Sequence, residues 1–101
     1  MLESKFQQKI KLKIETMFPG CFVLKNDPTY LQGFPDLLIL YKNKWAILEC
    51  KDDISSMSRS SSSISNQKYY IKKLDKMSFA RFIYPQNEEE VLYELQQAFK
   101  S

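Results

Sequence analysis

Residues 36–51 contain two apolar runs separated by three polar residues, and the stretch reads DLLILYKNKWAILECK. Short apolar runs of this kind, rich in branched and aromatic residues, predict strands rather than helices. Because only residues 42–44 separate the two runs, we expect residues 36–41 and 45–50 to pair as an antiparallel hairpin. Both runs are apolar on both faces, which is typical of strands that are covered on each side.

The segments around this hairpin predict one mixed α/β domain spanning residues 1–101. Phe6, Ile10 and Ile14 recur at the spacing of one helix face. The expected elements, in chain order, are a helix (3–17), three strands (21–24, 36–41 and 45–50), a helix (67–77), a strand (79–84) and a last helix after Asn87. This order predicts an α/β fold: a helix, a three-stranded antiparallel meander, a helix, a fourth strand completing a mixed four-stranded sheet, and a C-terminal helix.

Eight of the eleven residues from 55 to 65 are serine. Because such a stretch offers almost no apolar surface to bury, we expect a mobile loop there. Ser65 is the expected N-cap of the following helix, and Asn87 is the expected N-cap of the last helix.

The composition excludes several kinds of chemistry. The chain has no histidine, so Ser-His-Asp and Cys-His nucleophiles, imidazole bases and His-ligated zinc are all excluded. Its two cysteines, Cys21 and Cys50, cannot form a four-thiolate site, although a disulfide between them stays open. Any catalysis must therefore use carboxylates, lysines, hydroxyls or a metal held by oxygen atoms.

The charge is unevenly distributed along the chain. Residues 1–84 hold 14 Lys and Arg against 8 Asp and Glu, whereas residues 85–101 hold one Lys against four Glu. A basic body suits a polyanionic partner, and it also fits an ordinary lysine-rich surface. The longest apolar runs are about five residues, too short to span a membrane, and the first residues lack the apolar stretch of a signal peptide. We therefore expect a cytoplasmic protein with no membrane partner.

Three charged residues stand at the ends of the predicted hairpin. Asp36 opens the first strand, and Glu49 and Lys51 close the second. Residues two apart on a strand share a face, so Glu49 and Lys51 point the same way, and the hairpin brings Asp36 beside them. Two carboxylates next to a lysine can hold Mg²⁺ or Mn²⁺ through oxygen ligands, which would activate a water against a phosphate. The alternative is that Asp36 and Lys51 reach solvent and Glu49 is salt-bridged.

Glu3 is a candidate for a further carboxylate at this site. At 100° per residue, Ile10 and Ile14 lie within about 20° of Glu3, whereas Glu15 lies about 120° away. Glu3 therefore projects from the core-facing stripe, and Glu15 is expected to face solvent. A first-turn acid that complements the helix dipole is the other interpretation of Glu3.

These residues resemble a known nuclease signature. Gly33-Phe34-Pro35-Asp36, followed after twelve residues by Glu49-Cys50-Lys51, is similar to the PD-(D/E)XK nuclease motif. The chain looks most like the small stand-alone VRR-NUC nucleases of phages and bacteria, over residues 3–84. The further features of this resemblance are Glu3, the short hairpin, and Gln67 followed by Tyr70.

The resemblance implies a restriction-endonuclease-like core with a defined set of site residues. Asp36 and Glu49 would bind Mg²⁺ or Mn²⁺ together with the backbone carbonyl of Cys50, and Glu3 is the tentative further ligand. Lys51 would be the catalytic lysine, and Gln67 would add a polar group to the site. Taken by itself, Gln67 is an inward-facing glutamine that more commonly satisfies backbone groups.

The implied function is a metal-dependent DNA endonuclease that cuts branched or junction DNA, leaves 5′-phosphates and works as a homodimer. Two alternatives stay open: a non-catalytic nucleic-acid-binding module that retains the nuclease fold, and a small nucleic-acid-binding protein of unrelated fold. Lysines lie on the exposed sides of the first two helices. They either form ordinary solvated helix faces or contact DNA phosphates. Arg59 and Tyr30 are further candidates for DNA contact.

Overall fold

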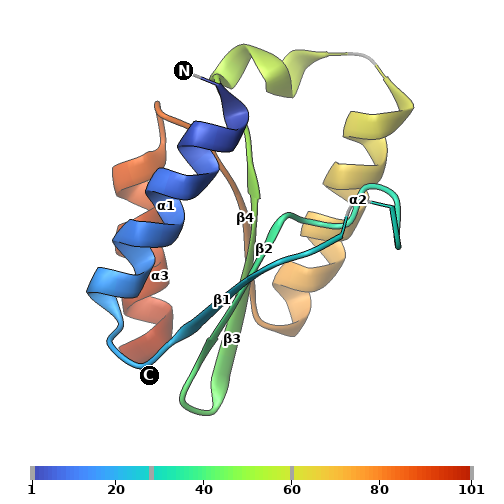
Figure 1. The fold of residues 1–101 in the computed structure, drawn as a ribbon. Coiled ribbons are helices and arrows are strands. Elements are labelled where there is room, and N and C mark those ends of the chain that lie inside the picture. The colour runs from blue at the N-terminus through green and yellow to red at the C-terminus, as the bar shows by residue number, and fades with distance from the viewer. Residues whose placement is uncertain (1, 28, 60, 101) are drawn as a thin grey trace.

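The computed structural model describes residues 2–27, 29–59 and 61–100, which form a mixed α/β fold (Figure 1). Its elements are α1 (Glu3–Met17), β1 (Phe22–Lys25), β2 (Leu37–Tyr41), β3 (Lys44–Cys50), the 3₁₀ helix η1 (Ile54–Ser58), α2 (Ser62–Met77), β4 (Phe79–Ile83) and α3 (Glu88–Lys100). The described residues thus form three α-helices and one four-stranded sheet, as the apolar spacing predicts.

The sheet has the strand order β1-β2-β3-β4. The first three strands form an antiparallel meander, and β4 pairs parallel to β3. The predicted hairpin is confirmed, with Leu37 opposite Leu48 and Tyr41 opposite Lys44. The crossover from β3 to β4 runs through η1 and α2, which carries the chain to the far side of the sheet (Figure 1).

Helices cover both faces of the sheet. α1 and α3 lie side by side on one face, and α2 lies on the other (Figure 1). The main core lies between the sheet and the α1–α3 pair, and it joins Phe6, Ile10 and Ile14 of α1 to alternate strand residues and to α3. The strand and α3 members of this core include Val23, Leu37, Ile39, Ala46, Leu48, Cys50, Ile83, Val91, Leu92, Leu95 and Phe99.

The strand residues that alternate with this core point toward the α2 side. α2 packs on β4 and β3. On β1 and β2, the apolar side chains of Phe22, Leu24 and Leu40 are exposed on the same side. Since β1 is an edge strand, the sheet has an apolar and accessible corner there.

The sequence predicts a loop at residues 55–65. This prediction is wrong for the described residues of the stretch, because most of them are helical. Residues 54–58 form η1, and α2 begins at Ser62, five residues earlier than predicted. Ser61, and not Ser65, is the N-cap, since its hydroxyl accepts a hydrogen bond from the Ile64 amide at 3.3 Å. Buried Ile64 gives this serine-rich turn an apolar anchor that composition alone does not reveal.

Asn87 stands directly before α3, as expected of an N-cap, and its backbone carbonyl accepts a hydrogen bond from the Val91 amide at 2.9 Å. Its side chain, however, bonds backward to the end of β4 and the turn that follows. Its side-chain oxygen accepts a hydrogen bond from the Tyr84 amide at 2.8 Å, and its side-chain nitrogen donates to the Phe82 carbonyl at 3.1 Å. The side chain therefore closes the turn between β4 and α3. Both cysteines are free thiols, so the disulfide that the sequence left open does not form. None of the described helices is long and apolar enough to cross a membrane.

Candidate functional site

The strand register brings Asp36 and Glu49 together. Leu37 and Leu48 are paired and point into the main core, so the neighbouring residues Asp36 and Glu49 point to the opposite, α2-facing side. Lys51 lies two residues beyond Glu49, and its Nζ is 3.7 Å from Glu49 Oε2. The arrangement is the one that the hairpin ends predicted: two carboxylates and one lysine at one end of two adjacent strands.

Asp36 is held from two directions. Its Oδ2 accepts a hydrogen bond from the Cys50 amide at 3.0 Å, and its backbone carbonyl accepts one from the Asn26 amide at 2.7 Å. The Asn26 side chain also donates to the Pro35 carbonyl at 2.7 Å. The Pro35–Asp36 turn is therefore clamped between the end of β1 and the end of β3, which orients the carboxylate.

Glu49 is the most unusual ionisable group of the site. Its residue is only 3% exposed. Burial, together with the adjacent Asp36 carboxylate, raises the pKa of Glu49 to about 9, although Lys51 opposes the shift. Two carboxylates held this close favour the uptake of one proton, or of a cation, between them.

The donor set suits a hard divalent cation in charge and in ligand type. Within residues 2–27, 29–59 and 61–100, however, no three His, Cys, Asp or Glu side chains lie close enough together to hold a metal ion. Asp36 and Glu49 would therefore need oxygen ligands from elsewhere, such as the Cys50 carbonyl and water. Burial raises the pKa of the Cys50 thiol well above its ordinary value, so this side chain is protonated and unsuited to act as a thiolate.

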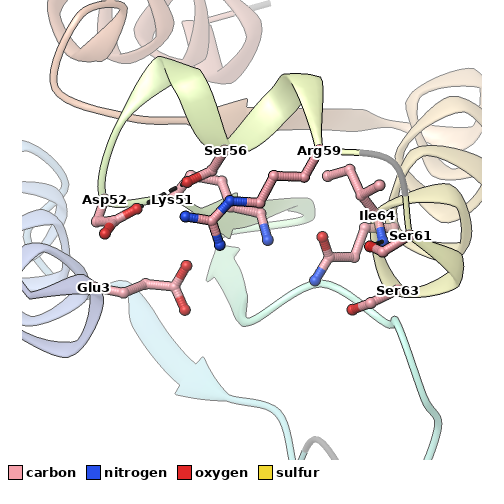
Figure 2. A pocket seen from close by; sticks show the side chains of 9 residues that line it. Glu3, Lys51, Asp52, Ser56, Arg59, Ser61, Ser63 and Ile64 are labelled. Carbon is pink, nitrogen blue, oxygen red and sulfur yellow. Dashed lines mark hydrogen bonds between the residues drawn. The ribbon is translucent and has the colours of Figure 1, made fainter.

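A cleft of about 370 Å³ opens next to Lys51 (Figure 2), and its described lining includes neither Asp36 nor Glu49. Its lining residues are Glu3, Lys51, Asp52, Ser56, Arg59, Ser61, Ser63, Ile64 and Gln67. They come from the start of α1, the end of β3, η1 and the first turns of α2. Lys51 belongs both to the cleft and to the Asp36–Glu49 group, so it connects the two.

The structure places Glu3 at the cleft and Glu15 away from it. The Glu3 carboxylate points into the cleft in Figure 2, whereas Glu15 pairs with Lys11 at 3.3 Å on the outside of α1. Removal from water raises the pKa of Glu3; Lys51 counteracts this rise, and Asp36 adds to it. Glu3 therefore lies within electrostatic reach of the paired carboxylates, without joining them in a three-carboxylate cluster.

Gln67 lines the cleft as well, and its Oε1 is a buried acceptor with no hydrogen-bond partner within the described part of the chain. A buried acceptor without a donor is costly, and such groups commonly mark a site that a water or ligand completes. The interpretation of Gln67 as a residue that only satisfies backbone groups is therefore wrong for its oxygen.

Asp52 and Asp53, which follow Lys51 directly, have structural partners. Asp52 accepts a hydrogen bond from the Ser56 hydroxyl at 2.9 Å, and Asp53 caps η1 by accepting from the Ser55 amide at 2.9 Å. Gln86, from the turn before α3, donates to Asp53 at 2.7 Å. Together these bonds fix η1 over the cleft. The sequence signal for this segment was the Asp-x-Ser cap, which the surrounding serines concealed.

Lys9, one of the lysines on the exposed side of α1, has an acidic partner within the protein. It pairs with Glu88 at 3.2 Å, and Lys13 also pairs with Glu88. Lys68, Lys72 and Lys76 are exposed on α2, as the sequence predicts. Tyr30 is exposed and does not line the cleft.

Comparison of this chain with protein-family models, with curated proteins and with solved structures finds no match.

Proposed function

We propose that this chain is a metal-dependent nuclease that hydrolyses DNA phosphodiester bonds. The observation that carries the proposal is the convergence of Asp36, Glu49 and Lys51 at the ends of two adjacent strands, beside a polar cleft. Buried Glu49 beside the partly buried Asp36 and Lys51 has little structural use, because withdrawing each charge from water costs desolvation energy. The order helix, meander, helix, strand supports a restriction-endonuclease-like core, and so does the Pro35-Asp36…Glu49-Cys50-Lys51 pattern.

The residues have distinct roles in the proposed reaction. Asp36, Glu49 and the Cys50 carbonyl would hold Mg²⁺ or Mn²⁺, which when bound polarises a phosphate and lowers the pKa of a nearby water. Lys51 orients the attacking water and offsets the charge that develops on the phosphate. The Gln67 Oε1, which has no donor among the described residues, would accept a hydrogen bond from this water.

The reaction itself is a hydrolysis. The water oxygen bonds to phosphorus while the bond from phosphorus to the 3′ oxygen breaks. The water releases one proton to solvent, and the 3′ oxygen takes one from solvent. The products are a 3′-hydroxyl and a 5′-phosphate. We further propose that branched or junction DNA is the substrate.

We also propose a homodimer. Each chain offers one proposed active site, so two copies are needed to cut both strands of a duplex. The exposed corner of β1 and β2, where Phe22 is 67% exposed, is the surface we propose for the second copy, since an edge strand can pair with its own copy about a two-fold axis. Sedimentation velocity tests this: a protein that stays monomeric at the concentrations at which it cuts DNA would contradict it.

A non-catalytic nucleic-acid-binding module is the second candidate. The observation that favours it is the nearly complete burial of Glu49 together with the lack of a third clustered carboxylate within the described residues. Such a module would bind DNA but would not cut it, whether Mg²⁺ or Mn²⁺ is present. Two observations favour the nuclease: Lys51 lies next to Glu49, and the Gln67 oxygen in the adjoining cleft has no partner within the described part of the chain.

The deciding experiment is cleavage of linear, flapped and four-way DNA with Mg²⁺, with Mn²⁺ and with neither. We expect cleavage only with metal. Glu49→Gln should abolish cleavage and Lys51→Ala should lower its rate at least about 100-fold. Glu49→Gln is expected to fold, because the amide keeps the shape of the side chain and carries no charge to bury.

Glu15→Gln is the matched control, since it removes a carboxylate from the outside of α1. It should cut like the wild type. Undiminished cleavage by a folded Glu49→Gln protein, or cleavage that survives complete chelation of metal, would refute the proposed function.

A further inference from the structure

Arg59 is one of only two arginines in a chain with thirteen lysines. The other, Arg81, has a structural position: it pairs with Asp75 and with Glu94, and its guanidinium lies over the Phe79 ring at 4.3 Å. Arg59 differs in every respect. It lines the cleft, and the ion pairs found among the described residues do not include it.

The Arg59 side chain reaches into the cleft from above. Figure 2 shows it extending from the end of η1 toward Lys51 and Glu3, which enter from β3 and α1. Its positive charge is close enough to counteract the raised pKa of Glu3. The Arg59 guanidinium and the Lys51 ammonium thus line the same cleft, together with the carboxylates of Glu3 and Asp52.

The 3₁₀ helix η1, which directly precedes Arg59, is held in place by several hydrogen bonds. Arg59 is the C-cap residue of η1, with extended backbone angles. η1 is held by the Asp53 cap, by the bond from buried Ser56 to Asp52, and by Gln86, which accepts from the Ile54 amide at 3.1 Å and donates to Asp53. A rotamer-rich side chain on such a support loses less entropy on binding than one on a free loop.

The chemistry of the guanidinium decides what it binds. Its planar fork of N–H donors matches two oxygens of a phosphate, and it stays charged at any working pH. We propose that Arg59 contacts the phosphate under attack and stabilises the negative charge that its oxygens gain as the bond to water forms. This inference rests on the proposed hydrolysis and adds a catalytic residue that the acidic pair and Lys51 do not supply.

The test compares the wild type with Arg59→Ala, Arg59→Lys and Lys100→Ala, using the DNA that the wild type cuts fastest. Lys100→Ala is the control, because it removes an exposed positive charge at the end of α3. The readouts are kcat with Mg²⁺, DNA affinity with Ca²⁺ in place of Mg²⁺, and the melting temperature. Added guanidinium chloride is a further readout, with sodium chloride at equal ionic strength as its control.

We expect Arg59→Ala to lower kcat about 100-fold, in the range measured when one donor to a developing oxyanion is removed. Low concentrations of guanidinium should restore part of this loss, and Arg59→Lys should stay well below the wild type. Arg59→Ala should weaken DNA binding in Ca²⁺ more than Lys100→Ala does. The melting temperature should not change. A kcat for Arg59→Ala within about threefold of the wild type would overturn the inference, as would full activity of Arg59→Lys.

The two proposals can fail separately. A wild type that cuts while Arg59→Ala cuts equally well leaves the proposed function standing and refutes the role of Arg59. A wild type that binds DNA and cuts none in either metal refutes the nuclease. In that case the DNA affinities measured in Ca²⁺ decide about the phosphate contact. Equal DNA affinities of Arg59→Ala and Lys100→Ala refute the contact, and a clearly lower DNA affinity of Arg59→Ala supports it.

Discussion

Glu3 and Glu15 belong to the same helix, α1, but their positions along it give their carboxylates different surroundings. Glu3 lies on the same helical stripe as Ile10 and Ile14 and lines the cleft, whereas Glu15 pairs with Lys11 one turn away. The angle between them follows from 3.6 residues per turn and needs no tertiary information. What the helical angle does not reveal is the distance from Glu3 to the acidic pair, because that depends on where α1 lies against the sheet.

A metal titration of the cleavage rate distinguishes these two residues. Glu3→Gln should raise the Mg²⁺ concentration at half-maximal rate by about tenfold, the effect typical of losing an outer carboxylate at a metal site. Glu15→Gln should leave the midpoint unchanged, since its carboxylate faces solvent. If Glu15→Gln shifts the midpoint more, or if neither variant shifts it, Glu3 is only a helix-start acid.

At the scale of elements, the loop before β2 and the start of α2 approach each other closely at Gly33. Gly33 has a φ of +84°, and a Cβ placed there would lie 2.6 Å from Asn66 Cβ, directly before Gln67. The glycine is therefore needed both for the backbone angle and for the contact with α2. This contact limits how far α2, with Gln67 at its cleft-lining face, can lie from the loop that leads to Pro35 and Asp36.

Replacing the two glycines by alanine separates these requirements. Gly20 also has a positive φ, of +90°, but a Cβ there meets nothing within 4 Å. Gly20→Ala should cost about 1–2 kcal/mol of unfolding free energy from the backbone angle alone. Gly33→Ala should cost a further ~1–3 kcal/mol, because Asn66 must move, and it should also lower the cleavage rate. Urea denaturation and cleavage assays of both variants measure this, and equal stability losses would show that α2 adjusts freely.

At the scale of the whole molecule, Glu88 joins the two helices that cover one face of the sheet. It begins α3, is buried, and pairs with Lys9 and Lys13 of α1. Burial alone would raise the pKa of Glu88, but the hydrogen bonds and charges of the two lysines outweigh it and hold the pKa below its ordinary value. The residue therefore contributes to stability in its charged form.

This pairing predicts how stability depends on pH. Because the pKa of Glu88 is lowered on folding, its contribution is present above the ordinary pKa of glutamate and is lost as the pH falls through the lowered value. At pH 7 Glu88→Gln should lower the unfolding free energy by about 1–2 kcal/mol, a moderate value since both lysines are half-exposed. The difference from the wild type should shrink below about pH 4.

Glu89→Gln is the control for the helix dipole, because Glu89 is an exposed acid in the same first turn. Urea denaturation from pH 3 to pH 8 measures all three proteins. A loss for Glu89→Gln as large as that for Glu88→Gln would assign the effect to the dipole and not to the ion pairs.

The sequence by itself determined the element order, the hairpin, the mixed sheet and the side from which Glu3 projects. These features depend on local patterns: alternation along strands, 3.6 residues per turn, and a short polar turn that makes neighbouring strands pair. The turn is one residue shorter than predicted, since Lys44 belongs to β3 and pairs with Tyr41. Asp36, Glu49 and Lys51 could be grouped for the same reason, since strand parity and a short turn fix which side chains face each other. Their catalytic role stays a proposal.

Only the tertiary structure decided what depends on contacts between distant segments. The helical form of the serine-rich stretch depends on Asp53 bonding to Gln86 and on buried Ile64, and neither contact leaves a periodic signal. The burial of Glu88 against Lys9 and Lys13 likewise depends on contacts between distant segments. So does the position of the Gln67 oxygen, which has no partner among the residues that the structure describes. The position of Arg59 in the cleft follows from η1, a segment whose composition predicts no structure at all. Composition measures how much apolar surface a segment carries, whereas its structure here comes from hydrogen bonds to residues more than thirty positions away.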